Sequence, residues 1–286
     1  MLNTWKTIAV LLDASAETQR DDGVGDYAAR LAHRDNAHLI GIFSLGSIAM
    51  AHQTDTYVKG EEAMRAVIDR IQAEKEQATV KAARQLADLA RWYDVVSELR
   101  ITAGSDAEAD ATLHALHCDL VIVGHPKPPG LPDRWTPERL LYAAGVPVLI
   151  VPEPVRSGAI ARHVLIAWNA SLEARRAVTD AMPFIANADA VTVLVVDADK
   201  KPGRHGEEPG ADVALFLARH GAKVEVLQAS SLDGSVAQGI LSHAGNHDVD
   251  LIVIGAYSRA RATEWILGGV TRTMLAQVHT PLLISR

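Results

Sequence analysis

The sequence predicts two α/β domains in tandem, each doubly wound around a parallel sheet. Two observations predict this class. The chain repeats three of its segments in the same order, and short apolar runs alternate with helical patterns along its length. Such alternation is typical of parallel sheets whose helices cover both faces. A chain of 286 residues is also longer than most single domains.

The internal repeat consists of three pairs of matched segments. They are 7–15 (TIAVLLDAS) with 163–171 (HVLIAWNAS), 119–124 (DLVIVG) with 250–255 (DLIVIG), and 147–151 (PVLIV) with 281–285 (PLLIS). Three matches in the same order indicate a duplication. The stretch 152–158, which contains two prolines and a glycine, separates the copies as a linker. We therefore expect domains at residues 1–153 and 160–286.

Ten runs rich in Val, Ile and Leu are the candidate strands. They lie at 6–13, 38–43, 97–102, 119–124 and 147–151, and at 163–169, 190–196, 223–228, 250–255 and 281–285. Most do not alternate apolar and polar residues, as expected of strands buried on both faces. Helical patterns separate them. A long charge-rich one spans 60–94, a shorter counterpart lies near 209–221, and Ser171 stands where it would cap a third.

Composition excludes several classes of function. The net charge of −7 argues against general nucleic-acid binding, which needs a basic surface. Cys118 is the only cysteine, so no intramolecular disulfide forms. No apolar run approaches the ~20 residues that span a bilayer, and the first residues lack a secretory pattern. We expect a cytoplasmic protein that binds neither nucleic acid nor membranes.

The candidate ligand site lies where strands of the second half end. In an open parallel sheet, ligands bind beyond the carboxyl ends of the strands, where strand order reverses. After the fourth strand come Gly255, Ser258 and, nine residues later, Gly268 and Gly269. Glycines let backbone N–H groups approach phosphate oxygens, and a helix starting near Gly268 offers its positive end to an anion. Val270 and Thr271 follow as further donors.

This turn resembles the phosphate loop of the universal stress protein family. Family members that bind ATP carry Gly-x2-Gly-x9-Gly-Ser/Thr after the fourth strand. Gly255 and Gly268 match that motif, whereas Ser258 replaces its second glycine and Gly269 its Ser/Thr. The resemblance covers nearly the whole chain. It implies five parallel strands in the order 3-2-1-4-5 in each half and an internal pseudo-dimer, with a homodimer as a further option.

The first strand of each half carries the second part of the resemblance. Family members place an aspartate at its end, near the adenine and ribose. Asp13 meets this expectation in the first half, and Asn169 replaces the aspartate in the second. Asparagine still offers hydrogen bonds to a ribose hydroxyl, without charge.

The first half lacks the phosphate loop. There are four prolines from Pro126 to Pro132, both included, and proline has no N–H to give a phosphate. Counting back from the fifth strand, Arg134 and Trp135 occupy the places of the two glycines. We therefore expect no nucleotide in the first half, with Trp135 and its loop blocking the site.

Structural interpretations compete with these functional ones. For Gly255, a role in packing and a role in ligand contact are evenly balanced. Arg259 and Arg261 suit either phosphate contact or a solvated loop. His114 and Cys118 have helical spacing with His117, but a buried apolar cysteine is favoured over zinc, and we expect no metal. Four further histidines are expected to be solvated, namely His205, His220, His243 and His247.

The expected function is a stress-response binding or scaffold module with unknown protein partners. Its second domain would bind an adenine nucleotide, ATP, weakly. The residues expected to hold it are Asn169, Gly255, Ser258, Gly268, Gly269, Val270 and Thr271. No catalytic motif is found. Two alternatives stay open. One is a slow ATP hydrolase or another nucleotide-dependent α/β enzyme. The other is a partner- or small-molecule-binding module with vestigial pockets, in which Trp168 fills part of the adenine site.

Overall fold

The structure, a computed structural model, describes most of the chain. The described residues are 4–13, 23–45, 60–102, 112–127, 131, 135–155, 158, 160–200, 203, 205–256 and 268–286. The strands are β1 Thr7–Leu12, β2 His38–Ser44, β3 Ser97–Thr102, β4 Leu120–His125, β5 Val148–Pro152, β6 His163–Ala167, β7 Ala190–Val196, β8 Val224–Ala229, β9 Leu251–Gly255 and β10 Leu282–Ser285. The α-helices are α1 Val24–Asp35, α3 Glu61–Tyr93, α5 Pro137–Ala144, α6 Leu172–Asp180, α7 Met182–Ile185, α8 Ala211–Arg219, α9 Val236–Asn246 and α10 Gly269–Ala276.

All ten predicted strands are present, and none of their ends shifts by more than two residues. The long helical pattern at 60–94 forms α3, and its shorter counterpart forms α8. Ser171 caps α6 as predicted, because its Oγ accepts the N–H of Ala174 at 3.1 Å. The α/β class is thus confirmed.

The chain divides into two compact units. One contains Lys6–Ala144 and Glu153–Val155, and the other contains Gly145–Pro152, Arg156–Arg286 and the N-terminal residues up to Trp5. β5 therefore clusters with the second repeat, although it belongs to the first. The expected domain limits, 1–153 and 160–286, stay a prediction.

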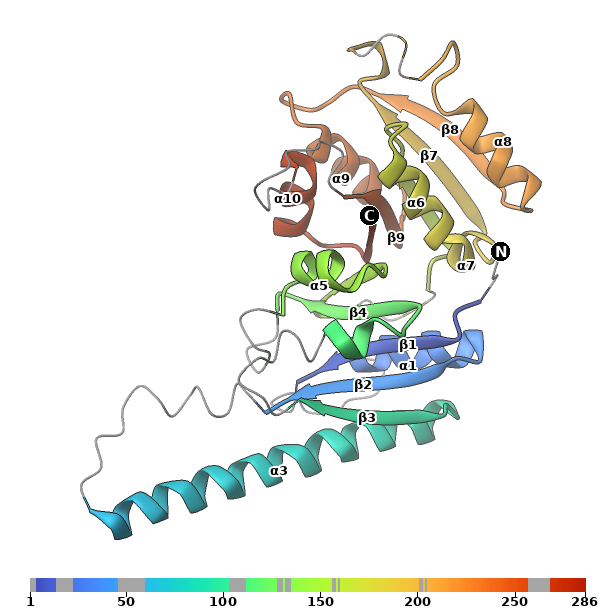
Figure 1. Cartoon of the computed structure of the whole chain (residues 1–286). Helices are drawn as coiled ribbons and strands as arrows, with labels where there is room; N and C mark the ends of the chain where they lie inside the picture. The colour runs from blue at the N-terminus through green and yellow to red at the C-terminus, as the bar shows by residue number, and fades with distance from the viewer. Residues whose placement is uncertain are drawn as a thin grey trace. The chain divides into compact units, whose positions relative to one another are not determined.

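The first unit holds four parallel strands in the order β3-β2-β1-β4. Helix α1 packs on β1, β2 and β4, and the C-terminal part of α3 packs on β2, β3 and α1 (Figure 1). The central strands are buried almost throughout. This is the pattern that their continuous apolar sequence predicts.

The second unit has the order β8-β7-β6-β9-β10, and all of these pairs are parallel. Counted within the repeat, this is the predicted order 3-2-1-4-5. β5 adds to β10 as an antiparallel strand, with Ile150 opposite Leu282. Helix α6 covers β9 and β10, α8 lies on β8, and α9 packs on β7 and α10.

An aspartate before the fourth strand of each half fixes the start of the first strand. Asp119 Oδ2 accepts the backbone N–H groups of Lys6 and Thr7, at 2.8 and 2.9 Å. In the second half, the two Asp250 carboxylate oxygens accept those of Arg162 and His163, both at 2.9 Å. The two carboxylates hold equivalent places in the repeat.

Among the described residues, none of the helices combines the length and the apolarity that crossing a bilayer requires.

Candidate functional site

The candidate site in the second unit is built around the carboxyl ends of β6 and β9. The parallel register pairs Ile166 with Val253, so the two strands end at the same edge. Trp168 extends β6 by one residue, because its N–H donates to the carbonyl of Leu194 at 2.9 Å. Its indole and the neighbouring Asn169 side chain are half-buried. This edge is where ligands of parallel sheets bind.

Asn169 shapes the turn into α6. Its Oδ1 accepts the N–H of Ser171 at 3.2 Å, and Ala170 between them adopts φ of 54°. Asparagine side chains commonly stabilise turns in this way. The sequence predicts that the Asn169 side chain binds a sugar hydroxyl. In the structure, its amide oxygen already accepts a hydrogen bond from Ser171 in the same turn.

Gly255 has a packing role. A Cβ atom at this position would lie 2.3 Å from the backbone nitrogen of Ala174 and 2.4 Å from the carbonyl carbon of Glu173. The end of β9 approaches the first turn of α6 so closely that only glycine fits. Gly255 was expected to serve either packing or ligand contact. This geometry supports packing, and it explains the glycine without a ligand.

Gly268 and Gly269 are different, since none of the described atoms around them requires glycine. Gly268 precedes α10 with φ of −56° and ψ of 147°, which any residue adopts. An added Cβ on either glycine meets no described atom within 4 Å, and both residues are exposed. No described side chain caps the helix.

The start of α10 presents backbone donors. The first hydrogen bond inside the helix runs from Arg272 N to Gly268 O at 3.1 Å. The N–H groups of Gly269, Val270 and Thr271 precede that bond and have no partner inside the helix. Val270 is exposed, whereas Thr271 is 5% exposed. The buried Thr271 side chain is thus a poor source of the hydroxyl that Gly269 lacks.

Three residues of the predicted site region cannot be placed. Ser258, Arg259 and Arg261 lie outside the described residues, which resume at Gly268.

The first unit has a buried tryptophan in the segment between β4 and α5. Trp135 is only 1% exposed and lies two residues before α5, which begins at Pro137. Asp13, at the end of β1, is also buried. Lys127 Nζ donates to the carbonyl of Leu131 at 2.9 Å. Counted back from the last strand of each half, the buried Trp135 corresponds to the exposed Gly269. That it blocks a nucleotide site in the first half stays a prediction.

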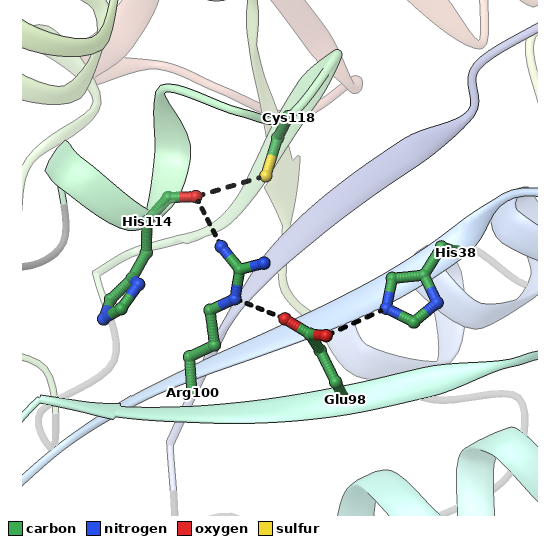
Figure 2. A network of polar contacts seen from close by, with 5 residues as sticks. All are labelled: His38, Glu98, Arg100, His114 and Cys118. Atoms are coloured by element: carbon green, nitrogen blue, oxygen red, sulfur yellow. Dashed lines mark hydrogen bonds and ion pairs between the residues drawn. The ribbon is translucent and has the colours of Figure 1, made fainter.

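A polar network lies on β2 and β3 of the first unit, with contributions from residues 114–118 (Figure 2). The carboxylate of Glu98 accepts a hydrogen bond from Arg100 and lies 3.4 Å from Nε2 of His38. Arg100 Nη1 donates to the carbonyl of His114 at 3.2 Å. The hydrogen bond from Arg100, opposed in part by desolvation, lowers the pKa of Glu98.

Cys118 belongs to this network as a buried thiol. Its Sγ donates to the backbone carbonyl of His114 at 3.4 Å, while the His114 ring points away (Figure 2). Burial raises the pKa of the Cys118 thiol to about 11. Among the described residues, no group of three His, Cys, Asp or Glu is arranged to hold a metal ion.

The second unit has a different polar cluster on its strands. His163 Nε2 lies 3.1 Å from Oγ1 of Thr192, which donates to Glu225 at 3.0 Å. The ring of His243 stacks on that of His247 at 4.0 Å, and His243 is half-buried. Burial, followed by repulsion from His247, lowers the pKa of His243. His243, which the sequence predicts to be solvated, is thus half-buried and stacked on the exposed ring of His247.

Sequence reasoning did not find these polar clusters or the paired aspartates. The aspartates were visible as the first letter of the matched segments DLVIVG and DLIVIG, but their partners are far away in sequence. Glu98 and Glu225 hold equivalent register positions, opposite Ile40 and Thr192. No local pattern reveals that correspondence.

Comparison with known proteins finds a family model that matches the second half and solved structures that share the fold of the whole chain. The sequence model of the universal stress protein family matches residues 161–286. A universal stress protein from Archaeoglobus fulgidus DSM 4304 superposes with a TM-score of 0.68 at 15% identity, covering 98% of this chain and 96% of that one. A functionally unknown protein from Pseudomonas aeruginosa PAO1 superposes with a TM-score of 0.56 at 13% identity, covering 99% and 93%. No curated protein sequence matches the chain.

Proposed function

Because the sequence model of the universal stress protein family matches residues 161–286, we propose that the chain is a stress-response binding module whose second domain binds ATP weakly. The first domain carries no nucleotide and acts as a scaffold. The proposal places the phosphates at the start of α10 and the sugar toward Asn169.

The observation that carries this proposal is the pair of exposed glycines at the start of α10. Glycine at such positions lowers helix stability, and here neither backbone conformation nor described packing calls for it. An anion would account for both residues. Three N–H groups and the positive end of the helix dipole point in the same direction, and no described side chain covers them.

Weak binding follows from the side chains present. The family motif has a hydroxyl at the position of Gly269, and Thr271 is buried. A lost hydrogen bond to a charged group costs about 1.5–3 kcal/mol. Each ~1.4 kcal/mol is a tenfold change in affinity, so we expect binding about one to two orders of magnitude weaker than with the hydroxyl.

Titration calorimetry with ATP tests the site. Gly268→Trp covers the donors without straining the backbone, and we expect it to abolish the binding heat. Gly245→Trp is the matched control, because Gly245 is an exposed glycine of α9 with open surroundings. Equal binding by wild type and Gly268→Trp contradicts the location. Tight wild-type binding contradicts the weakness.

The half-buried indole of Trp168 favours a second candidate, a module whose adenine pocket is partly filled and which binds a partner or another small molecule. Trp168→Ala separates the two candidates. If the indole fills the pocket, the variant binds ATP more tightly than wild type. If the indole stacks on the base, the variant binds more weakly.

The proposed module acts in the cytoplasm. Cell fractionation followed by detection of the chain tests this location directly.

A further inference from the structure

The end of helix α9 carries two histidines whose rings stack. His243 lies in the last turn of the helix, and His247 follows it by one turn as the C-cap residue. The ring centroids are 4.0 Å apart and the rings are inclined by 15°. His243 is half-buried, whereas His247 is exposed. Two imidazoles pack in this way while at most one of them is charged, because two positive charges so close repel each other.

A charge on His247 leaves its own hydrogen bond intact. Nδ1 of His247 lies 2.9 Å from the carbonyl oxygen of His243, and because a carbonyl only accepts, this nitrogen carries a hydrogen. A second proton therefore goes to Nε2 and does not disturb the bond. The negative end of the helix dipole accommodates the charge. Below neutral pH, the half-buried ring of His243 thus has a cation stacked on it.

The other groups around His243 come from the elements on which α9 packs. They are His163 on β6, Thr192 on β7 and Glu225 on β8. The Thr192 hydroxyl donates to Glu225 at 3.0 Å, so it accepts the Nε2 hydrogen of His163 at 3.1 Å. Glu225 is thus already engaged through Thr192. The charged residue of α10, which also packs on α9, is Arg272, and it is exposed.

These surroundings disfavour a proton on His243. Burial and, next, the charge of His247 lower the pKa of His243; Glu225 opposes them only in part, and His163 adds a smaller repulsion. The folded state therefore binds this proton less tightly than the unfolded chain, whose histidines titrate near pH ~6.5. The contribution of His243 to stability is thus complete above about pH 6.5 and is lost as the pH falls through the lowered pKa.

The first unit has no histidine pair at the corresponding place. Counted from the matched segments DLVIVG and DLIVIG, Thr112 and Leu116 correspond to the two stacked histidines. There, Arg100 donates to Glu98 on its own strand and to the carbonyl of His114 at 3.2 Å (Figure 2). A guanidinium keeps its charge at every pH at which proteins are folded. The first unit therefore joins strand and helical turn through a permanent cation.

Helix α8 of the second unit offers the same arrangement with a neutral ring. Its C-cap residue His220 also donates from Nδ1 to the carbonyl one turn earlier, that of Phe216, at 2.8 Å. The two rings lie 4.4 Å apart. Phe216 takes up no proton, and Arg175, 4.4 Å from the centroid of that ring, stays positive throughout. The charge beside His220 therefore does not change with pH.

We propose that the end of α9 is a pH-sensitive switch, which loosens the helix from the sheet when His243 and His247 both carry a proton. Helix α8 and the first unit keep their packing at the same pH. The loosening extends to α10, because α10 packs on α9 and Gln277 accepts a hydrogen bond from Gln238 at 2.8 Å. The switch thus reaches the helix whose start presents backbone donors.

Amide hydrogen exchange of the full chain at about pH 5 and pH 7.5 tests the switch, with rates corrected for the intrinsic pH dependence of exchange. We expect the protection of α9 to fall several-fold at the lower pH. Because pH ~5 is about 1.5 units below the ordinary histidine pKa, linkage through one histidine limits this loss to about 30-fold. The amides of α8 and of the strands of the first unit should keep their protection.

His243→Phe gives α9 the ring pair of α8, so this variant should keep α9 protected at about pH 5. His220→Phe is the matched control, because it removes the C-cap histidine of α8 and leaves α9 unchanged. It should show the same acid loss in α9 as wild type. Circular dichroism of both variants at each pH verifies that they fold.

Nuclear magnetic resonance of the histidine rings gives an independent readout. The ring of His243 should titrate below the ordinary histidine range in wild type, and His247→Phe should move that titration to higher pH, since it removes the neighbouring charge. Equal protection of α9 at both pH values overturns the proposal. So does an acid loss that His243→Phe leaves unchanged, or one that α8 shares.

Discussion

The two halves of the chain are alike where their strands begin and different where their strands end. Asp119 and Asp250 make equivalent pairs of hydrogen bonds to the start of the first strand. After the fourth strand, Trp135 is buried in one half, whereas Gly268 is exposed in the other. The shared feature belongs to the sheet that both halves need. The difference lies after the fourth strand, and parallel sheets bind ligands beyond the carboxyl ends of their strands. We therefore expect the difference to reflect function.

The largest effect on stability should come from a substitution of Gly255, where the end of β9 packs against the first turn of α6. Gly255→Val inserts a side chain into the backbone of Glu173 and Ala174. We expect it to destabilise the second unit by about 3 kcal/mol. Hydrogen exchange of the β9 and β10 amides measures the loss within that unit.

Gly245→Ala provides the control for this change. Gly245 lies in α9 with no described neighbour near its Cβ position, so alanine should stabilise the helix by up to about 1 kcal/mol. If the β9 amides exchange as slowly in Gly255→Val as in wild type, that result contradicts the close packing of α6 against Gly255.

The difference between these two glycines shows how far the sequence predicts the structure. The strands and their order could be predicted because buried parallel strands are continuous apolar runs, and because the repeat shows each element twice. The role of Gly255 could not, since it depends on Glu173 in a helix 82 residues earlier in the chain. The exposed glycines at α10 were found because two glycines opening a helix are unusual in sequence alone.

Loss of the paired aspartates tests the likeness between the halves. Asp119→Ala and Asp250→Ala each remove a carboxylate that accepts two backbone N–H groups. Hydrogen bonds to charged groups contribute about 1.5–3 kcal/mol, so we expect each variant to lose about 2–3 kcal/mol. Hydrogen exchange of β1 and of β6, read separately, assigns each loss to its half.

Asp69→Ala is the control for both variants, because Asp69 is exposed on α3. We expect it to change stability by less than about 0.5 kcal/mol. Clearly unequal losses for Asp119→Ala and Asp250→Ala mean that the two carboxylates do not have the same structural role.

Substitutions at the ends of the first strands test the difference between the halves. Asp13→Ala should leave ATP affinity unchanged, because the first half has no proposed site. Asn169→Ala should weaken ATP binding about tenfold, since the proposal places this amide toward the sugar and its loss also loosens the turn that Ser171 completes. Calorimetry measures both. A large loss with Asp13→Ala shows that the first half holds the nucleotide.

The smallest effect concerns the protonation of Asp250. Burial raises the pKa of this carboxyl, and the hydrogen bonds from Arg162 and His163 only partly oppose the rise. The folded state therefore holds the proton more tightly than the unfolded state. As the pH rises from about 4, the unfolded chain loses this proton first. The contribution of Asp250 to stability therefore falls as the pH rises through the raised pKa of the folded state.

Asp250→Asn removes the titration and keeps one amide oxygen as an acceptor. The stability of wild type relative to Asp250→Asn should therefore be greatest at acid pH and decline as the pH rises above about 4. Urea unfolding of both proteins across this range measures the difference, with Asp69→Asn as the exposed control. A difference that grows with pH means that the two hydrogen bonds outweigh burial, and that Asp250 is stabilised by its charge.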